Sequence, residues 1–281
     1  MTGATDLSWV ADLTIVLVTH DSRCALKENF EGLDRDLRDR LLIVDNASTD
    51  GSAELAASWQ AKVIRSPHNL GFAAAANIGA EAASTRCLCF MNPDCRPDRA
   101  LFRAGVGTIT GEPHRIASPL LDEGLPVVSG GRQPGYTAWK LLLDTICTNY
   151  GGHGSKLYRW CERQKGFHDS SWHWAHGACL FLHRSTFLAL GGFDEAYFLY
   201  MEDVDLGRRA AGRGCQVVEI PVAVKHKAGH SCENSSRLRR RWLNRSRELY
   251  ASRYYGGGLA TGLAVLAAPA GLVRLIRRWQ E

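Results

Sequence analysis

Three carboxylates fall within four residues, at Glu202, Asp203 and Asp205, behind an aromatic run and ahead of two arginines. The aromatic run favours burial, and a buried carboxylate is costly unless it is paired, binds a metal or transfers a proton. In a helix that begins at Glu202, Glu202 and Asp205 share one face and Asp203 points elsewhere. The segment therefore predicts one carboxylate free to act as a base. An acidic first turn that favours the helix dipole is the alternative.

The elements that would position such a base begin with strands and helices in alternation. Continuous apolar runs predict four buried strands, at residues 13–18, 41–44, 61–64 and 87–91. Helix-like stretches separate or precede them, at residues 23–33, 52–59 and 73–83. This alternation predicts a parallel sheet with helices on both faces, a Rossmann-like half in which ligands bind beyond the carboxyl ends of the strands.

Polar side chains follow these strands where a ligand would lie. Asp45, directly after the second strand, is a candidate acceptor for the imide N–H of uracil or thymine, although residues 45–52 also suit a turn and a helix cap. Asp94, in the run Asn92-Pro93-Asp94 after the fourth strand, is a candidate ligand for a hard divalent cation that also holds a diphosphate. An Asn-Pro-Asp run is also an ordinary turn.

Other nucleotide-binding patterns do not occur in this chain. No GxxxxGK[ST] run exists, which excludes a P-loop, and no GxGxxG follows a strand. Gly71 and Gly79 lie too far apart for a dinucleotide fingerprint. The arginine-rich C-terminal arm lacks interleaved aromatic residues for base stacking, so nucleic acid is not an expected partner.

The second half of the chain is less regular. Residues 111–170 are rich in Gly, Pro and His and give no clear pattern. The remaining expected elements are a strand at 177–182, a helix at 184–190, an edge strand at 217–220 that ends at Pro221, and a helix at 236–255.

Charge is distributed unevenly along the chain. Residues 237–281 hold ten arginines and two glutamates but no lysine or aspartate, a net charge of +8, so the rest carries −3 of the chain's +5. The uncharged stretch 256–273 is only weakly hydrophobic, which favours an interfacial helix on an anionic membrane over a spanning helix. A helix packed on the protein is the alternative. Residues 1–12 show no signal peptide and the nine cysteines form no CxxC pair, so we expect a cytoplasmic protein, peripheral on the inner membrane face.

Five stretches, in order and at familiar spacing, resemble the inverting family 2 glycosyltransferases with a GT-A fold, in particular the rhamnosyltransferase-like branch. They are residues 15–22, 44–52, 69–79, 92–94 and 191–205. The resemblance covers about residues 13–231. It implies an α/β GT-A fold with a nucleotide-sugar-binding half at 1–110, an acceptor-binding and catalytic half of the same domain at 111–232, and a basic helical arm at 233–281.

The resemblance also implies roles for individual residues. The nucleotide-binding residues would be Thr19, His20, Asp45, Asn46, Asn69, Gly71, Asn77 and Asn92. Asp94 and His226 would hold Mn²⁺ or Mg²⁺, and Asp203 would be the general base beside Glu202. Asn92 replaces the first acid of the family's Asp-x-Asp motif, which implies weak metal binding.

A dTDP- or UDP-linked sugar, with rhamnose as the expected sugar, would be transferred to a saccharide or lipid-linked saccharide acceptor in cell-envelope polysaccharide synthesis. Candidate contacts for the acceptor or a diphosphate are Trp172, Trp174, His176, Arg245 and Arg247. For the aromatic residues, core packing at a domain seam is the alternative. Two other functions remain open at this point: a nucleotidyltransferase, and a catalytically silent membrane-tethered protein that binds saccharide or nucleotide.

Overall fold

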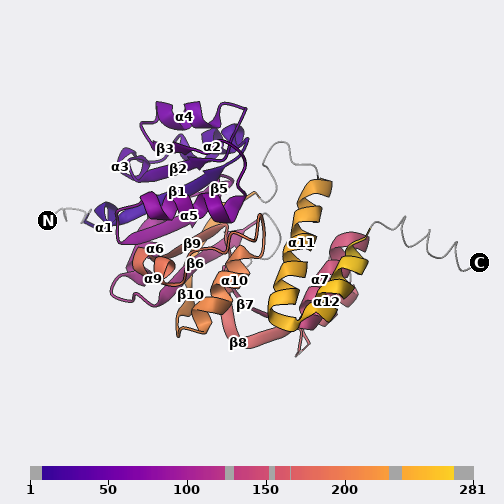
Figure 1. Cartoon of the computed structure of the whole chain (residues 1–281). Helices are drawn as coiled ribbons and strands as arrows, with labels where there is room; N and C mark the ends of the chain where they lie inside the picture. The colour runs from indigo at the N-terminus through magenta and orange to yellow at the C-terminus, as the bar shows by residue number, and fades with distance from the viewer. Residues whose placement is uncertain (1–7, 124–129, 152–155, 165, 228–235, 269–281) are drawn as a thin grey trace, which may run out of the picture. The chain divides into compact units, whose positions relative to one another are not determined.

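The computed structural model describes residues 8–123, 130–151, 156–164, 166–227 and 236–268 (Figure 1). The chain forms two compact units, which are described separately. Unit 1 comprises residues 1–133, 172–198 and 202–234, and unit 2 comprises residues 134–171, 199–201 and 235–281. The predicted division at residues 110 and 232 into two halves of one domain and an arm stays a prediction.

Unit 1 is built on an eight-stranded sheet in the order β3-β2-β1-β4-β9-β6-β10-β5. Its strands are β1 (Leu13–Thr19), β2 (Leu41–Asp45), β3 (Lys62–Arg65), β4 (Cys87–Met91), β5 (Cys95–Arg96), β6 (Arg115–Asp122), β9 (Cys179–His183) and β10 (Gln216–His226). The first four strands are mutually parallel, as the alternating pattern predicted. β9 is antiparallel to both of its neighbours, β4 and β6, so the sheet is mixed.

Helices cover both faces of this sheet, which confirms the prediction from the doubly buried strands. The helices of unit 1 are α1 (Ser8–Ala11), α2 (Arg23–Phe30), α3 (Arg35–Arg38), α4 (Ser52–Ser58), α5 (Phe72–Ala82), α6 (Arg99–Ile109), α9 (Arg184–Ala189) and α10 (Glu202–Ala211). Successive residues of β1 enter different cores, because side chains alternate along a strand. Ile15 belongs to the core with Phe30 of α2 and Phe102 of α6. Val16 belongs to the core with Ala76 of α5 and Leu206 of α10.

Two strands differ from the sequence-based expectation. The predicted edge strand ending at Pro221 is wrong, because β10 continues through Pro221 to His226 and lies between β6 and β5. A register shift between Ile220 and Ala223 places Pro221 in a bulge, where the missing N–H of proline needs no ladder partner. β6 lies in the stretch that gave no pattern.

Unit 2 is mainly helical. Its helices are α7 (Ala138–Tyr150), α8 (Lys156–Glu162), α11 (Ser236–Tyr255) and α12 (Gly257–Ala267). α7, α11 and α12 pack against one another, and α11 matches the predicted helix at 236–255. β7 (Arg132–Tyr136) and β8 (His168–Ala175) form a separate two-stranded sheet.

The uncharged segment predicted at 256–273 is helical over α12, and residues 269–273 lie outside the described part of the chain. Leu263 of α12 is fully buried, whereas Val265 is 63% exposed, so one side of the helix packs on the protein. None of the helices in the described part of the chain combines the length and the apolar character needed to cross a membrane.

Candidate active site

The three carboxylates of α10 lie as their spacing predicted. Glu202 and Asp205 are buried, whereas Asp203 is partly exposed. The carboxylate of Asp205 accepts a hydrogen bond from Arg209 Nε at 2.7 Å. Arg209 also donates to the backbone oxygens of Leu190 and Gly192, so Asp205 helps to fix the Gly-Gly turn rather than to face a ligand.

Asp203 and Glu202 have different electrostatic environments. Asp203 Oδ2 accepts the N–H of Gly177 at 2.8 Å, and Oδ1 accepts the N–H of Val204 at 2.8 Å. Burial raises the pKa of Asp203, while His176 and the two N–H groups partly oppose that rise. Burial, reinforced by the charge of Asp203, raises the pKa of Glu202 well above its usual range. Of the two carboxyl groups, Glu202 is therefore the one whose neutral form the fold favours more strongly.

The backbone that leads into α10 is strained. Tyr200 and Met201 both have positive φ, 70° and 69°, although neither is a glycine. Such a conformation costs on the order of 1 kcal/mol per residue and persists only where the surroundings enforce it. Within unit 2, Ser246 of α11 donates a hydrogen bond to the backbone oxygen of Leu199 at 2.8 Å. Strain of this kind directly before two carboxylates is typical of a functional site.

Asp94 and His226 belong to a second cluster of titratable side chains. Asp94 follows β4, and His226 ends β10, where β5 pairs with it. His226 Nε2 lies 3.4 Å from Asp94 Oδ1, and its Nδ1 lies 3.3 Å from Glu123 Oε1. Burial alone would lower the pKa of His226, but the two carboxylates together raise it above its usual value. Asp94 Oδ1 is buried and accepts no hydrogen bond from the described residues.

This group fits a divalent cation. Ligand atoms of Asp94, Cys95 and His226 all lie within 4.8 Å of one another. Burial raises the pKa of Cys95 well above its usual value, and its Sγ donates to the backbone oxygen of Ala178 at 3.3 Å, so it remains a thiol. The orphaned carboxylate oxygen of Asp94 and the imidazole of His226 are the donors that Mn²⁺ accepts.

His176 lies between the two groups. Its ring packs against that of His226, with centroids 6.1 Å apart, and against that of Trp174, at 5.8 Å. Burial lowers the pKa of His176, and the charge of Asp203 opposes that change. Its Nδ1 accepts the N–H of Ala178 at 3.1 Å. Trp172 is buried and lies against the Arg208 guanidinium, 5.6 Å from its ring centroid.

Thr19 and Asp45 meet at the carboxyl ends of β1 and β2, where they are register partners. Thr19 Oγ1 donates to Asp45 Oδ1 at 2.9 Å, and Asp45 Oδ2 accepts the N–H of Ser48 at 3.1 Å. Each carboxylate oxygen has two lone pairs, so one acceptor position on each remains. The predicted acceptor for a base is therefore fixed in place and retains capacity for a further hydrogen bond.

Asn46, Asn69 and Gly71 form one network beside this pair. Asn46 Nδ2 donates to Asn69 Oδ1 at 2.9 Å and to the Gly71 oxygen at 3.0 Å. Gly71 has φ +84°, and a Cβ there would lie 2.3 Å from the backbone oxygen of Phe198. The network holds the turn that opens α5, and Gly71 permits the close approach of the segment before α10.

The other predicted nucleotide contacts are placed differently. The amide of Asn77 is bonded to the backbone of Phe193 at both ends and to Glu195 Oε1, so it fixes that turn. His20 Nδ1 lies 2.9 Å from the Asn46 oxygen, near the Thr19 end of β1. Asn92 continues β4 beyond its carboxyl end, and its N–H donates to the Ala178 oxygen.

The two predicted arginines are separated within unit 2. Arg247 is buried, donates to Thr148 Oγ1 at 2.9 Å and lies 3.8 Å from Asp144, which also binds Lys140 at 2.7 Å. Arg245 lines an open pocket of unit 2. The structure therefore gives Arg247 a packing role that its sequence position did not reveal.

Two groups of the site have no local sequence signal. Glu123 follows β6 in the irregular stretch and reaches His226 only through the pairing of β6 with β10. The N–H of Gly177 that binds Asp203 is a backbone group. A Cβ at Gly177 would lie 3.1 Å from Asp203 Oδ2, so the glycine that begins the predicted strand at 177–182 was the one available hint.

Two family descriptions and several known proteins match this chain. Residues 14–184 match the family described as Glycosyl transferase family 2, and residues 154–280 match Glycosyl transferase family group 2. A Mycobacterium tuberculosis N-acetylglucosaminyl-diphospho-decaprenol L-rhamnosyltransferase is 52% identical over 59 residues. That alignment spans 21% of this chain and only 19% of the relative.

Solved structures share the fold. The structure of GalNAc-T7 with UDP, GalNAc and Mn²⁺ has a TM-score of 0.58 at 17% identity and aligns over 86% of this chain and 50% of its own. The Pyrobaculum calidifontis mannosyltransferase PcManGT, with GDP-Man and Mn²⁺, has a TM-score of 0.55 at 16% identity and aligns over 95% and 80%. These neighbours confirm the predicted GT-A fold. Because one family description matches more than half of its residues, the chain belongs to glycosyl transferase family 2.

Proposed function

We propose that this glycosyltransferase moves a sugar from a dTDP- or UDP-linked donor to a hydroxyl of a saccharide or lipid-linked saccharide, with inversion. The observation that carries the proposal is the placement of one candidate base and one candidate metal site around a single loop. The N–H of Gly177 binds Asp203, while the ring of the preceding His176 packs on His226, which pairs with Asp94.

The nucleoside would bind at the carboxyl ends of β1 and β2. Asp45 keeps free acceptor positions after its bonds to Thr19 and Ser48, which supports a role as acceptor for the imide N–H of uracil or thymine. His20 and the Asn46–Asn69 network lie beside it. Because the amide of Asn77 is committed to other groups, it is left out of the proposed site.

Asp94 and His226 would hold a divalent cation. Such an ion, when bound, stabilises the negative charge that develops on a leaving diphosphate. Asn92 stands where the family motif has an acid, which lowers the negative charge of the site and supports weak metal binding. The buried Oδ1 of Asp94, which accepts no hydrogen bond from the described residues and lies 3.4 Å from His226 Nε2, is the feature of this chain that favours a metal there.

Asp203 would act as the general base. The acceptor oxygen attacks the anomeric carbon, its proton passes to the Asp203 carboxylate, and the bond from that carbon to the diphosphate oxygen breaks. A single displacement inverts the anomeric configuration. Glu202, held neutral by burial, would lie beside the base without competing for the proton.

Rhamnose and a lipid-linked acceptor are the proposed substrates. The M. tuberculosis relative is named as a rhamnosyltransferase that acts on a sugar linked to a decaprenol by diphosphate. Because the likeness covers 59 residues, it supports these substrates as a proposal only. A role in cell-envelope polysaccharide synthesis follows from the same proposal.

Unit 2 would lie against the inner surface of the membrane. Large apolar side chains are exposed on its helices, namely Trp139, Ile146, Tyr150, Trp160, Leu238 and Val265. Together with the arginines of α11 they offer the mixture of aromatic, apolar and cationic groups that interfacial helices use.

Calorimetric titration of dTDP, UDP and GDP, each with and without Mn²⁺, tests the donor class. We expect dTDP or UDP to bind more tightly with Mn²⁺, and Asp94→Ala to remove the effect of the metal while leaving the circular dichroism spectrum unchanged. Asp45→Ala should weaken the binding of dTDP and of UDP, both with and without the metal. Equal binding of all three nucleotides, or a metal effect that survives in Asp94→Ala, would contradict the proposed site.

A further inference from the structure

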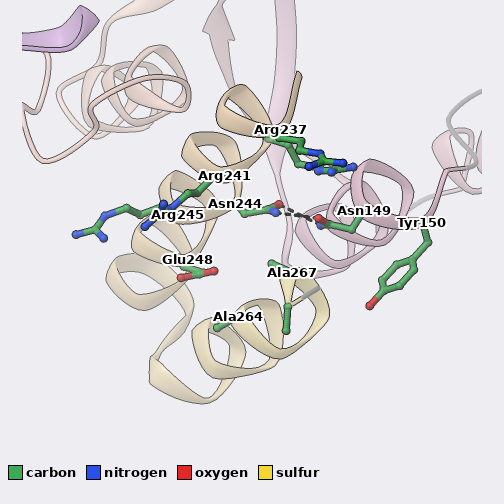
Figure 2. A pocket seen from close by; sticks show the side chains of 11 residues that line it. Asn149, Tyr150, Arg237, Arg241, Asn244, Arg245, Glu248, Ala264 and Ala267 are labelled. Atoms are coloured by element: carbon green, nitrogen blue, oxygen red, sulfur yellow. Dashed lines mark hydrogen bonds between the residues drawn. The ribbon is translucent and has the colours of Figure 1, made fainter. Parts of the chain in front are cut away.

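Unit 2 contains an open pocket of about 860 Å³ that no step of the proposed reaction uses (Figure 2). Three helices line it: α7, α11 and α12. The lining residues are Asn149, Tyr150, Arg237, Arg240, Arg241, Asn244, Arg245, Glu248, Ala264, Ala267 and Ala268. The pocket thus has a charged wall from one helix and an apolar wall from another.

The charged wall is a single stripe of α11. Its members recur every three or four residues from Arg237 to Glu248, which is the spacing of one helix face. This face is open to solvent, and its four arginines are exposed. Here it carries four guanidinium groups and one carboxylate, a net charge of +3. Figure 2 shows Arg237, Arg241 and Arg245 along this helix.

The positive charge of this stripe is not neutralised within the described part of the chain. Arg245 interacts electrostatically with Glu248 of the same stripe, whereas Arg237, Arg240 and Arg241 have no ion pair or hydrogen bond with another described residue. Arg237 with Arg241, and Arg241 with Arg245, are like charges four residues apart on a helix, which repel one another. By contrast, the nearby Arg247 is buried and paired with Asp144. The stripe therefore favours an anionic ligand with more than one negative charge.

The opposite wall suits a hydrocarbon. Ala264, Ala267 and Ala268 bring only methyl groups, and α12 carries no charged residue. Tyr150, 51% exposed, adds an aromatic ring at the α7 side. The two asparagines of the pocket, Asn149 and Asn244, bond to each other at 3.2 and 2.9 Å, so the surface between the walls is already hydrogen-bonded.

We propose that this pocket binds the diphosphate and the first part of the hydrocarbon chain of a lipid diphosphate. The guanidinium groups of α11 bind the diphosphate oxygens, because planar guanidinium pairs well with phosphate. The hydrocarbon lies along the alanines of α12. This lipid diphosphate would be the carrier of the sugar acceptor, so the inference rests on the proposed function.

Two other occupants fit less well. A phospholipid headgroup brings one phosphate charge to a wall of net charge +3, whereas a diphosphate ester brings about two. The end of the chain, residues 269–281, adds Arg274, Arg277 and Arg278 with a single glutamate, so its charge repels the stripe.

The direct test is binding of farnesyl diphosphate, a soluble lipid diphosphate, to the full chain by calorimetry. EDTA and saturating UDP are present, so that the candidate metal and donor sites do not contribute. We expect farnesyl diphosphate to bind at least tenfold more tightly than inorganic diphosphate and than farnesol, since only the first engages both walls.

Matched variants locate the site. Arg241→Glu should weaken the binding of farnesyl diphosphate tenfold or more. Arg253→Glu, the same charge change on α11 outside the pocket, should weaken this binding less than threefold. Ala267→Trp should fill the space beside the apolar wall, and so weaken the binding of farnesyl diphosphate without weakening the binding of inorganic diphosphate. Val265→Trp, on the same helix but not lining the pocket, is its control. Unchanged circular dichroism spectra and unchanged UDP binding without EDTA report that each variant folds.

Three outcomes would overturn the proposal. If farnesyl diphosphate binds no more tightly than inorganic diphosphate, the apolar wall takes no part in binding. Equal losses in Arg241→Glu and Arg253→Glu would indicate unspecific charge attraction. Binding to phosphatidylglycerol vesicles alone would assign the stripe to the membrane surface. Because Asp203→Asn should bind farnesyl diphosphate normally, a failure of the proposed transfer reaction is distinguishable from a failure of this site.

Discussion

Replacement of Asp203 by asparagine should separate donor binding from sugar transfer. The variant keeps nearly the same shape but can no longer take a proton from the acceptor. General base catalysis contributes about 10²–10⁴ in rate. We therefore expect kcat to fall by that factor, which corresponds to about 2.7–5.5 kcal/mol in the activation barrier.

The structure limits the side effects of this substitution. Asp203 accepts two backbone N–H groups, one on each oxygen, and asparagine has one acceptor oxygen. The variant should lose one hydrogen bond, about 0.5–1.5 kcal/mol of stability. Removal of a carboxylate whose pKa is raised by burial offsets part of that loss. The folded structure and the donor site should therefore survive.

Glu202→Gln is the matched control. Burial and the charge of Asp203 raise the pKa of Glu202 well above its usual range, so glutamine reproduces the neutral form that the fold favours. Activity should stay within about threefold of the unmodified protein, since no charge is removed.

Transfer is measured with radiolabelled nucleotide sugar and acceptor, at saturating donor, alongside calorimetric Kd values for the nucleotide. Asp203→Asn should have an unchanged Kd and a kcat reduced by orders of magnitude. Turnover above one tenth of normal in Asp203→Asn, or an equal loss in Glu202→Gln, would refute the assignment of the base.

Three other results are expected. Burial raises the pKa of Asp203 and the base must be ionised, so kcat/KM should fall as the pH decreases through a value above 3.8, the ordinary pKa of aspartate. pH–rate profiles should show this fall at low pH in variants that keep Asp203 and lose it in Asp203→Asn. Arg247→Met should lower the free energy of unfolding by about 1.5–3 kcal/mol, because it removes the hydrogen bond to Thr148 and the ion pair with Asp144 from a buried charged group, whereas Arg245→Met should change urea denaturation little. Gly71→Ala should lower the melting temperature by several degrees, because its Cβ would collide with the Phe198 oxygen, and a normal melting curve would show that this contact is not tight.

Local patterns were sufficient for the elements whose apolar residues run without interruption. The strands β1, β2 and β4 are buried on both faces, and hydrophobic runs report that directly. The predicted burial of the strand at 61–64 is wrong, because β3 is an edge strand with exposed ends. The spacing of Glu202 and Asp205 likewise fixed which carboxylates are buried, because it depends only on the helical repeat. The sequence motifs also identified the family.

Local sequence patterns were insufficient where contacts between distant segments decide the structure. Nothing near Pro221 reveals that β10 continues to His226, because the bulge depends on the neighbouring β6. The commitment of Asn77 to the Phe193 turn depends on a segment far along the chain. Each of these features is a contact between distant residues, which propensity does not encode.

The sequence by itself determined which side chains are chemically able to act: the carboxylates of α10, Asp94 and the arginines of α11. Only the tertiary structure decided which of them are available. Arg245 and Arg247 are two residues apart, yet one lines a pocket and the other is buried against Asp144. The physical reason is that burial and pairing set whether a charged group is neutralised by the protein or left for a ligand, and both depend on the packed neighbours.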